Sequence, residues 1–188
     1  LEEWKDLGFG DVKKDDLIQK RLPIDTKHFS EDFEERLLQM LGDKGNLDDL
    51  VDGILVKSDN FHALRLLQEK YKEKVKCIYI DPPYNTGSDE FIYKDNYQHS
   101  SWLSMMAERL ALAKELMRKD GAIFVSIDNH ELANLQEVME QEYGRQNLVG
   151  IFAVQSNPRG RYLEKHIATS HEYLLLYSKS SSDLQLKG

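Results

Sequence analysis

From Gly53 onward, short apolar stretches alternate with stretches of helical periodicity, and this alternation restricts the folds open to the chain. The apolar stretches, which have the length and composition of β-strands, are 54–59, 75–81 and 121–128. The amphipathic stretches that follow them are 60–71, 102–117 and 131–143. Strands that alternate with helices form an open, mostly parallel sheet with helices on both faces. The sequence therefore predicts an α/β fold.

The two ends of the chain depart from this pattern. Residues 147–155 and 172–179 predict two further strands, and the polar loop between them shows no helical periodicity, so we expect an antiparallel pair. Residues 1–50 are acidic, weakly apolar and helical in pattern, with Ser30 placed to cap a helix. We interpret residues 1–50 as a small helical appendage and residues 51–188 as the main domain.

Several side chains have a predicted structural role. Asp59 is placed to cap the helix that follows it, and Asp128 with Glu131 forms a D-x-x-E pattern that starts a helix. Cys77 lies in an apolar run, where a buried thiol is expected. The residues that share one apolar face in the helix at 102–117 are Leu103, Met106, Leu110, Ala113 and Met117.

The composition argues against several classes of protein. With one cysteine and no His and carboxylate residues at ligand spacing, we expect neither disulfides nor a metal site. There is no long apolar segment and no leader, which predicts a cytoplasmic protein, and a start at Leu1 is typical of a piece of a longer chain. A formal net charge of -8 disfavours general nucleic-acid binding, so any DNA contacts have to come from local basic residues.

The sequence DPPYNTG, residues 81–87, directly follows a predicted strand. Ligands bind at the carboxyl ends of strands in open α/β sheets, so this loop is a candidate site by position. Pro82 and Pro83 fix the backbone and remove two N-H donors, which leaves outward carbonyl groups as acceptors. Asp81 adds a carboxylate acceptor, and Tyr84 adds an aromatic face.

Two converging acceptors beside an aromatic face suit a planar ring that bears an amino group. A base inside a duplex has to be flipped out before a protein can reach that group. Hydrogen bonds from the amine to Asp81 and to the Pro82 carbonyl would favour a more tetrahedral nitrogen, whose lone pair points at an incoming methyl group. The proton is then lost to Asp81 or to water. The alternative is a Pro-Pro turn in which Asp81 and Asn85 bond the local backbone.

The loop is one part of a wider resemblance. DPPYNTG after CIYI, then WLSMMAERLALAKELMRKDGAIFVSIDNHE and NPRGRYLEKHIATSHEYLLLYSKS, resemble the DNA amino-methyltransferases, and most closely the modification subunit of type III restriction-modification systems. The stretches LPIDTKHF and ILVKSDNFHALRLL fit the same subunit. The resemblance implies a Rossmann-like sheet, incomplete in this chain, and S-adenosylmethionine as the cofactor.

The resemblance also implies roles for residues. The catalytic loop would consist of Asp81, Pro82, Pro83 and Tyr84, and Asp in the first place accompanies methylation of adenine at N6. Asp59 and Asp81 would face the cofactor, and Asn85 is a candidate contact to the substrate. The DNA-binding candidates of the basic loop are Arg159, Arg161 and Lys165, although a solvated loop explains these three residues equally well.

Other functions stay open at this point. Ser in the first place of the loop is commoner in enzymes that act on cytosine N4, and one residue is a modest discriminator. A non-catalytic DNA-binding or assembly module could keep the same fold. Methylation of a glutamine in a protein is a third reading, but that chemistry resembles an Asn-Pro-Pro-Tyr loop.

The chain also lacks a glycine-rich turn after a strand, which a site for S-adenosylmethionine usually includes. The type III subunits are circularly permuted, with the catalytic half first and the glycine-rich half last. We therefore expect this chain to be inactive by itself. The resemblance further implies double-stranded DNA as the substrate, a homodimer of intact subunits and a restriction subunit as a potential partner.

Overall fold

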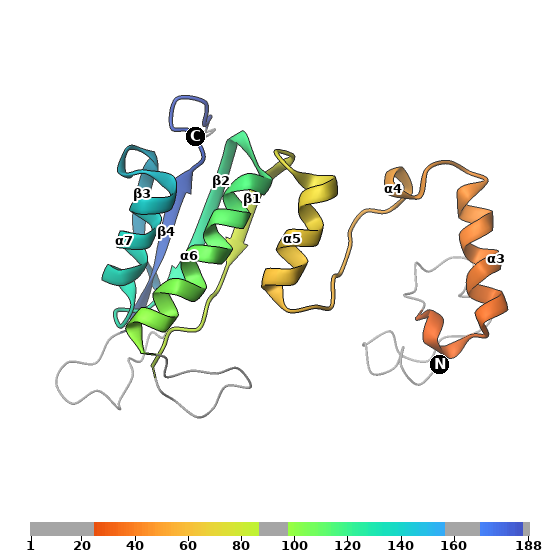
Figure 1. Ribbon diagram of the computed structural model, residues 1–188, viewed down its shortest axis with the longest axis horizontal. Helices are drawn as coiled ribbons and strands as arrows, with labels where there is room; N and C mark the ends of the chain where they lie inside the picture. Colours follow the sequence, from red (N-terminus) through yellow and green to blue (C-terminus); the bar gives the residue numbers. More distant parts are fainter. Residues whose placement is uncertain (1–24, 87–97, 157–169, 186–188) are drawn as a thin grey trace. The chain divides into compact units, whose positions relative to one another are not determined.

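The computed structural model describes residues 25–86, 98–156 and 170–185. The chain divides into two compact units, Leu1–Leu55 and Val56–Gly188 (Figure 1). All side chains that are buried among the described residues belong to the second unit. The second unit therefore contains the hydrophobic core.

A four-stranded sheet forms the centre of the second unit. Its strands are β1 (Val75–Ile80), β2 (Met117–Ile127), β3 (Leu148–Gln155) and β4 (His171–Ser178). The spatial order is β1-β2-β4-β3, with β1 parallel to β2 and the other two pairs antiparallel. The predicted strands at these four places are confirmed. The sheet is mixed because β4 runs antiparallel to both of its neighbours, β2 and β3.

Three helices of the second unit accompany the sheet among the described residues. They are α5 (Asn60–Tyr71), α6 (His99–Leu116) and α7 (Leu132–Tyr143), and the 3-10 turn η2 (Arg145–Asn147) leads into β3. Helices α6 and α7 lie side by side on one face of the sheet, and α5 packs against α6 (Figure 1). This arrangement confirms the α/β class. The prediction of a mostly parallel sheet is wrong for the described strands, because two of the three pairs are antiparallel.

The core lies between α6, α7 and the central strands. Successive strand residues point to opposite faces of a sheet, and the residues of β2 that face the helices are Ile123, Val125 and Ile127. The helices contribute Trp102, Met106, Leu110, Ala113, Leu135, Val138, Met139 and Tyr143. Of the predicted apolar face, Met106, Leu110 and Ala113 are buried in α6, whereas Met117 is buried as the first residue of β2.

The opposite face of the sheet is exposed at its edge strands. Tyr79 in β1 and Phe152 in β3 keep 62% and 49% of their surface accessible. Cys77 is also exposed, so the prediction of a buried thiol is wrong. Ile78 and Ile80 point toward the helices, and the alternation along the strand therefore turns Cys77 to the other face.

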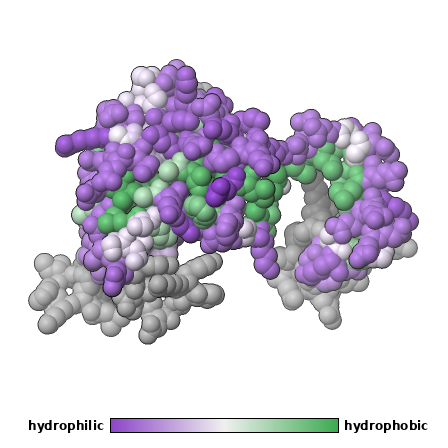
Figure 2. All heavy atoms as spheres, in the orientation of Figure 1, coloured by the Kyte–Doolittle hydropathy of each residue, from purple (hydrophilic) through white to green (hydrophobic). Residues whose placement is uncertain are grey.

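On the side of α6 and α7, hydrophilic residues predominate around smaller hydrophobic patches (Figure 2).

Residues 54–59 do not form the strand that their composition predicts. Ile54 and Leu55 are 56% and 97% exposed. A strand needs a hydrogen-bonded neighbour, and the described sheet provides none for this segment. The predicted cap at its end is confirmed, because Asp59 Oδ1 accepts a hydrogen bond from the backbone N of Phe61 at 3.0 Å.

The first unit consists of short helices in its described part. These are η1 (Thr26–His28), α3 (Glu31–Gly42) and α4 (Leu47–Leu50), and none of them contains a buried residue. Ser30 occupies the N-cap position of α3 as predicted, but its side chain makes no capping hydrogen bond. None of the helices that the structure describes is long and apolar enough to cross a membrane.

Candidate active site

The loop 81–86 leaves the sheet at an edge that several elements share. β1 and β2 are parallel and pair Ile80 with Val125, so their carboxyl ends lie at the same edge. β4 runs in the opposite direction and pairs Tyr173, near its start, with Ile127 at the end of β2. The fold therefore brings the loop after β1, the residues after β2 and the start of β4 to one edge of the sheet.

Asp81 is exposed, whereas the loop residues after it are half-buried. The half-buried part is held from α6, because the indole N-H of the fully buried Trp102 donates to the carbonyl of Pro83 at 2.9 Å. The acceptors predicted from the sequence, the Asp81 carboxylate and the Pro82 carbonyl, lie just before this anchored residue. The loop thus combines an accessible carboxylate with a fixed backbone.

Tyr84 is anchored from a different element. Its hydroxyl donates to Oε2 of Glu172 in β4 at 3.2 Å, and its ring packs against the hydrophobic core. Burial raises the pKa of the Tyr84 phenol well above its usual value, and the nearby carboxylates of Asp81 and Glu172 raise it further. The phenol therefore stays protonated at neutral pH and remains a hydrogen-bond donor.

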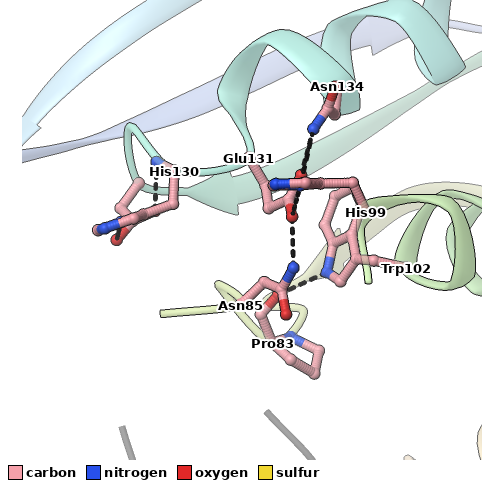
Figure 3. A network of polar contacts seen from close by, with 8 residues as sticks. Pro83, Asn85, His99, Trp102, His130, Glu131 and Asn134 are labelled. Carbon is pink, nitrogen blue, oxygen red and sulfur yellow. Dashed lines mark hydrogen bonds and ion pairs between the residues drawn. The ribbon is translucent and has the colours of Figure 1, made fainter. Parts of the chain in front are cut away.

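Asn85 is anchored by Glu131, whose side chain is fully buried (Figure 3). Asn85 Nδ2 donates to Oε1 of Glu131 at 2.5 Å. His99 Nδ1 lies 2.8 Å from the same oxygen, and Asn134 Nδ2 donates to Oε2 at 2.6 Å. Asn85 has a φ of 59°, in the left-handed region that Asn adopts more readily than most residues. Three consecutive loop residues are therefore held by side chains from three different places in the fold.

The start of α7 differs from the predicted capping box. Glu131 is the N-cap residue of α7 but makes no side-chain capping bond, because its carboxylate turns to the loop instead. Asp128 accepts from the backbone N of His130 at 2.9 Å and from its ring Nδ1 at 2.8 Å. The predicted D-x-x-E start is therefore wrong, and His130 lies apart from the group around Glu131 (Figure 3).

The family model for DNA methylases of the N6/N4 type matches residues 75–186 of the chain. The chain belongs to the DNA methylase family. The matched stretch runs from β1 to beyond β4 and includes both the loop 81–86 and Glu131. The residues matched by the family model therefore include every element at the edge of the sheet described above.

Curated relatives of this chain include two modification subunits. The type III restriction-modification enzyme EcoP15I Mod subunit of Escherichia coli is 37% identical, with 70% of this chain and 25% of the relative covered. The probable type III HindVI Mod subunit of Haemophilus influenzae is 40% identical, with 72% and 18% covered. The chain thus spans a quarter or less of the length of these relatives.

Among solved structures, the M1.HpyAVI-SAM complex matches 66% of this methylase chain and 54% of its own, with 16% sequence identity and a TM-score of 0.45.

Two groups of predicted site residues lie away from the loop or outside the described structure. Asp59 caps α5, and Arg109 Nη2 of α6 lies 3.9 Å from its Oδ1. The basic candidates Arg159, Arg161 and Lys165 lie outside the described residues. The segment that contains these three is flanked by Ser156 and Ser170, which are joined by a backbone hydrogen bond of 3.1 Å. Since β4 starts at the edge of the loop 81–86, Ser156 and Ser170 lie near that edge.

Sequence reasoning missed the residues that anchor the methylase loop. The sequence pattern predicts only that Trp102 starts a helical stretch, that Glu131 belongs to a helix start and that Glu172 lies in a strand. An indole N-H and carboxylates are polar groups that need partners when buried, so Trp102 and Glu131 could have been marked as hydrogen-bonding residues. Their partner could not have been named, because the contacts join segments that are far apart in the sequence.

Among the residues that the structure describes, no group of three or more His, Cys, Asp or Glu side chains is placed to hold a metal ion.

Proposed function

We propose that this chain carries the catalytic loop of a DNA adenine-N6 methyltransferase of the type III modification kind, with S-adenosylmethionine as methyl donor. The main support is the loop geometry: the exposed Asp81 stands at the carboxyl end of β1, and the residues after it are anchored by Trp102, Glu172 and Glu131. An accessible acceptor on a fixed backbone is what orientation of a reacting amine requires. The proposed location is the cytoplasm, where the DNA lies.

In this proposal the flipped adenine places its N6 amino group between Asp81 and the Pro82 carbonyl. Both hydrogen bonds favour the nitrogen geometry in which the lone pair is available for attack. The N6–methyl bond forms while the sulfur–methyl bond of the donor breaks, and the sulfur keeps the electron pair. One N6 proton then passes to Asp81 or to water, which leaves a neutral secondary amine.

The cofactor contributes an electrophilic methyl group on a positively charged sulfur. Asp81 fits such a neighbour, because its carboxylate is exposed at the sheet edge and can attract positive charge. Asp59 is proposed as the second residue that faces the cofactor. We propose that residues of a longer polypeptide complete this site, and that the chain by itself does not turn over.

The DNA contacts are proposed on the same edge. Tyr84 would stack on the flipped base, and Arg159, Arg161 and Lys165 would neutralise phosphates. Asn85 donates one amide N-H to Glu131, so a contact from Asn85 to DNA would use its side-chain oxygen or its second N-H. A homodimer of the complete polypeptide and a restriction subunit complete the proposed set of partners.

The test uses the full-length polypeptide that contains these residues, as wild type and as Asp81→Ala. Each is incubated with labelled S-adenosylmethionine and unmethylated double-stranded DNA, and the labelled nucleoside is identified after digestion. We expect N6-methyladenine from the wild type and a rate lower by about a hundredfold or more in Asp81→Ala. Asp49→Ala, at an exposed position of α4, serves as the matched control and should keep the wild-type rate.

The other possible outcomes of this assay would lead to different conclusions. N4-methylcytosine would keep the mechanism and change the base. Absence of any labelled nucleoside from a folded full-length protein would overturn the proposal and favour a non-catalytic DNA-binding or assembly module. Activity of the 188-residue chain alone would refute the need for further residues.

A further inference from the structure

Glu131 is a fully buried carboxylate that lies between three parts of the chain (Figure 3). Its hydrogen-bond partners come from the loop after β1, from the first residue of α6 and from the first turn of α7; these partners are Asn85, His99 and Asn134. Such a group joins segments that the sequence separates widely.

The burial of Glu131 requires these partners. A carboxyl group removed from water destabilises the fold unless hydrogen bonds replace its hydration. Amide N-H groups of Asn85 and Asn134 bond one oxygen each, at 2.5 and 2.6 Å. Oε1 is shared by Asn85 and by His99 Nδ1, which lies 2.8 Å away, so loss of the Asn85 bond would remove one of the two contacts of this oxygen, and loss of the Asn134 bond would leave Oε2 without its donor. The carboxylate is therefore best satisfied when the loop is in place.

Asn85 transmits this preference to the loop. Its backbone is in the left-handed region, with a φ of 59°, which costs energy for a residue with a side chain. The hydrogen bond to Glu131 stabilises that conformation, and Trp102 holds the carbonyl of Pro83 on the other side of Tyr84. The two bonds together fix the path of the backbone from Pro83 to Asn85.

We propose that Glu131 is a positioning residue of the methyltransferase site, which holds the loop in its reactive conformation by accepting a hydrogen bond from Asn85. This inference rests on the proposed function, because the residues it positions are Asp81 and the Pro82 carbonyl. We expect Glu131 to affect the rate of methyl transfer rather than the affinity of the protein for DNA or cofactor.

The test exchanges the polarity of the bond. In Asn85→Asp a second carboxylate meets Glu131, which replaces attraction by repulsion. In Glu131→Gln one of the two acceptor oxygens becomes an N-H group; the remaining oxygen can still accept from Asn85, and the new N-H then opposes the amide N-H of Asn134, so this variant weakens the anchor less. The double variant Asn85→Asp with Glu131→Gln restores one donor and one acceptor, and Asp also tolerates the left-handed backbone. Glu137→Gln, at an exposed position of α7, is the matched control.

The measurements use the full-length polypeptide that contains these residues. Single-turnover methyl transfer is expected to slow by about tenfold to a hundredfold in Asn85→Asp and by less in Glu131→Gln, with little change in the DNA dissociation constant of Glu131→Gln. The double variant should recover most of the loss, and Glu137→Gln should match the wild type. Hydrogen exchange of a peptide that covers residues 81–86 should be faster in the single variants and slower again in the double variant.

Unfolding temperatures separate loss of the fold from loss of the loop conformation. If Glu131→Gln does not fold, the comparison of Asn85→Asp with the double variant decides. Unchanged methyl transfer and unchanged exchange in Asn85→Asp would overturn the proposal, and so would a double variant no better than Asn85→Asp. If the wild type transfers no methyl group, the proposed function fails, and the exchange data alone decide whether Glu131 holds the loop.

Discussion

At the scale of single residues, buried polar groups distinguish positions that look alike in the sequence. Tyr143 and Tyr177 are both fully enclosed aromatic residues of the core, with ring centroids 6.1 Å apart. The hydroxyl of Tyr143 donates to the carbonyl of Leu110 at 3.2 Å. The hydroxyl of Tyr177 is buried and has no partner among the described residues. The two tyrosines therefore contribute differently to stability.

Replacing each of these tyrosines by Phe tests this difference. Tyr143→Phe should lower the free energy of unfolding by about 1 kcal/mol, because it removes a satisfied hydrogen bond. Tyr177→Phe should leave stability unchanged or raise it by up to about 1 kcal/mol, because it removes a desolvated hydroxyl. Urea unfolding at neutral pH measures both. A clear loss of stability in Tyr177→Phe would show that its hydroxyl has a partner.

Tyr177 should also make the stability of the fold depend on pH. Burial, and then the charge of Glu140, raises the pKa of Tyr177 to about 12. Because the folded protein holds this proton more tightly than the unfolded chain does, the contribution to stability is complete below about pH 10 and is lost as the pH rises toward 12. Tyr177→Phe should therefore lose less stability in this alkaline range than the wild type.

At the scale of elements, the pairing of β1 with β2 depends on one close backbone approach. The register of the pair is irregular between Val75 and Cys77. Gly121 lies at this irregularity, and a Cβ added there would stand 2.9 Å from the carbonyl oxygen of Arg118 and 3.1 Å from that of Val75. These are backbone atoms, which move only if the strands move. The glycine thus lets β1 approach β2 and so places the loop after β1.

Gly121→Ala should therefore destabilise the second unit by about 1 to 3 kcal/mol, the usual cost of overpacking. Gly53→Ala is the control, because a Cβ at that position meets no atom within 4 Å and should change stability by less than about 0.5 kcal/mol. Thermal or urea unfolding of both variants measures the effect. Equal stability of the Gly121→Ala and Gly53→Ala variants would show that β1 and β2 separate easily at this point.

At the scale of the whole molecule, the face of the sheet away from α6 and α7 has exposed apolar residues in its edge strands, including Tyr79, Phe152 and Val154. Cys77 is exposed on the same face and is the one cysteine of the sequence. Since the curated relatives are several times longer than this chain, we expect further residues of a longer polypeptide to cover this face.

The reactivity of Cys77 tests this expectation. In the 188-residue chain the thiol should react with a small thiol reagent at nearly the rate of the unfolded chain, because it is exposed. In the full-length polypeptide the rate should be at least about tenfold lower, as expected for a thiol reached only through opening of the structure. Mass spectrometry of the labelled peptide measures both rates. Equal rates in the two proteins would contradict the idea that further residues cover this face.

The sequence by itself determined the α/β class, the places of the four strands, the helix stripe around Leu110 and the position of the DPPY loop, because these depend on local periodicity and on residue types with strong conformational preferences. The predictions of a strand at residues 54–59 and of a buried thiol at Cys77 were wrong, because both depend on which other elements pack against these residues. Sequence reasoning also failed at Glu131, where a cap and a distant hydrogen bond compete for one carboxylate. Only the tertiary structure decided how the loop is held, because Trp102, Glu172 and Glu131 reach it from segments that meet only when the sheet has formed.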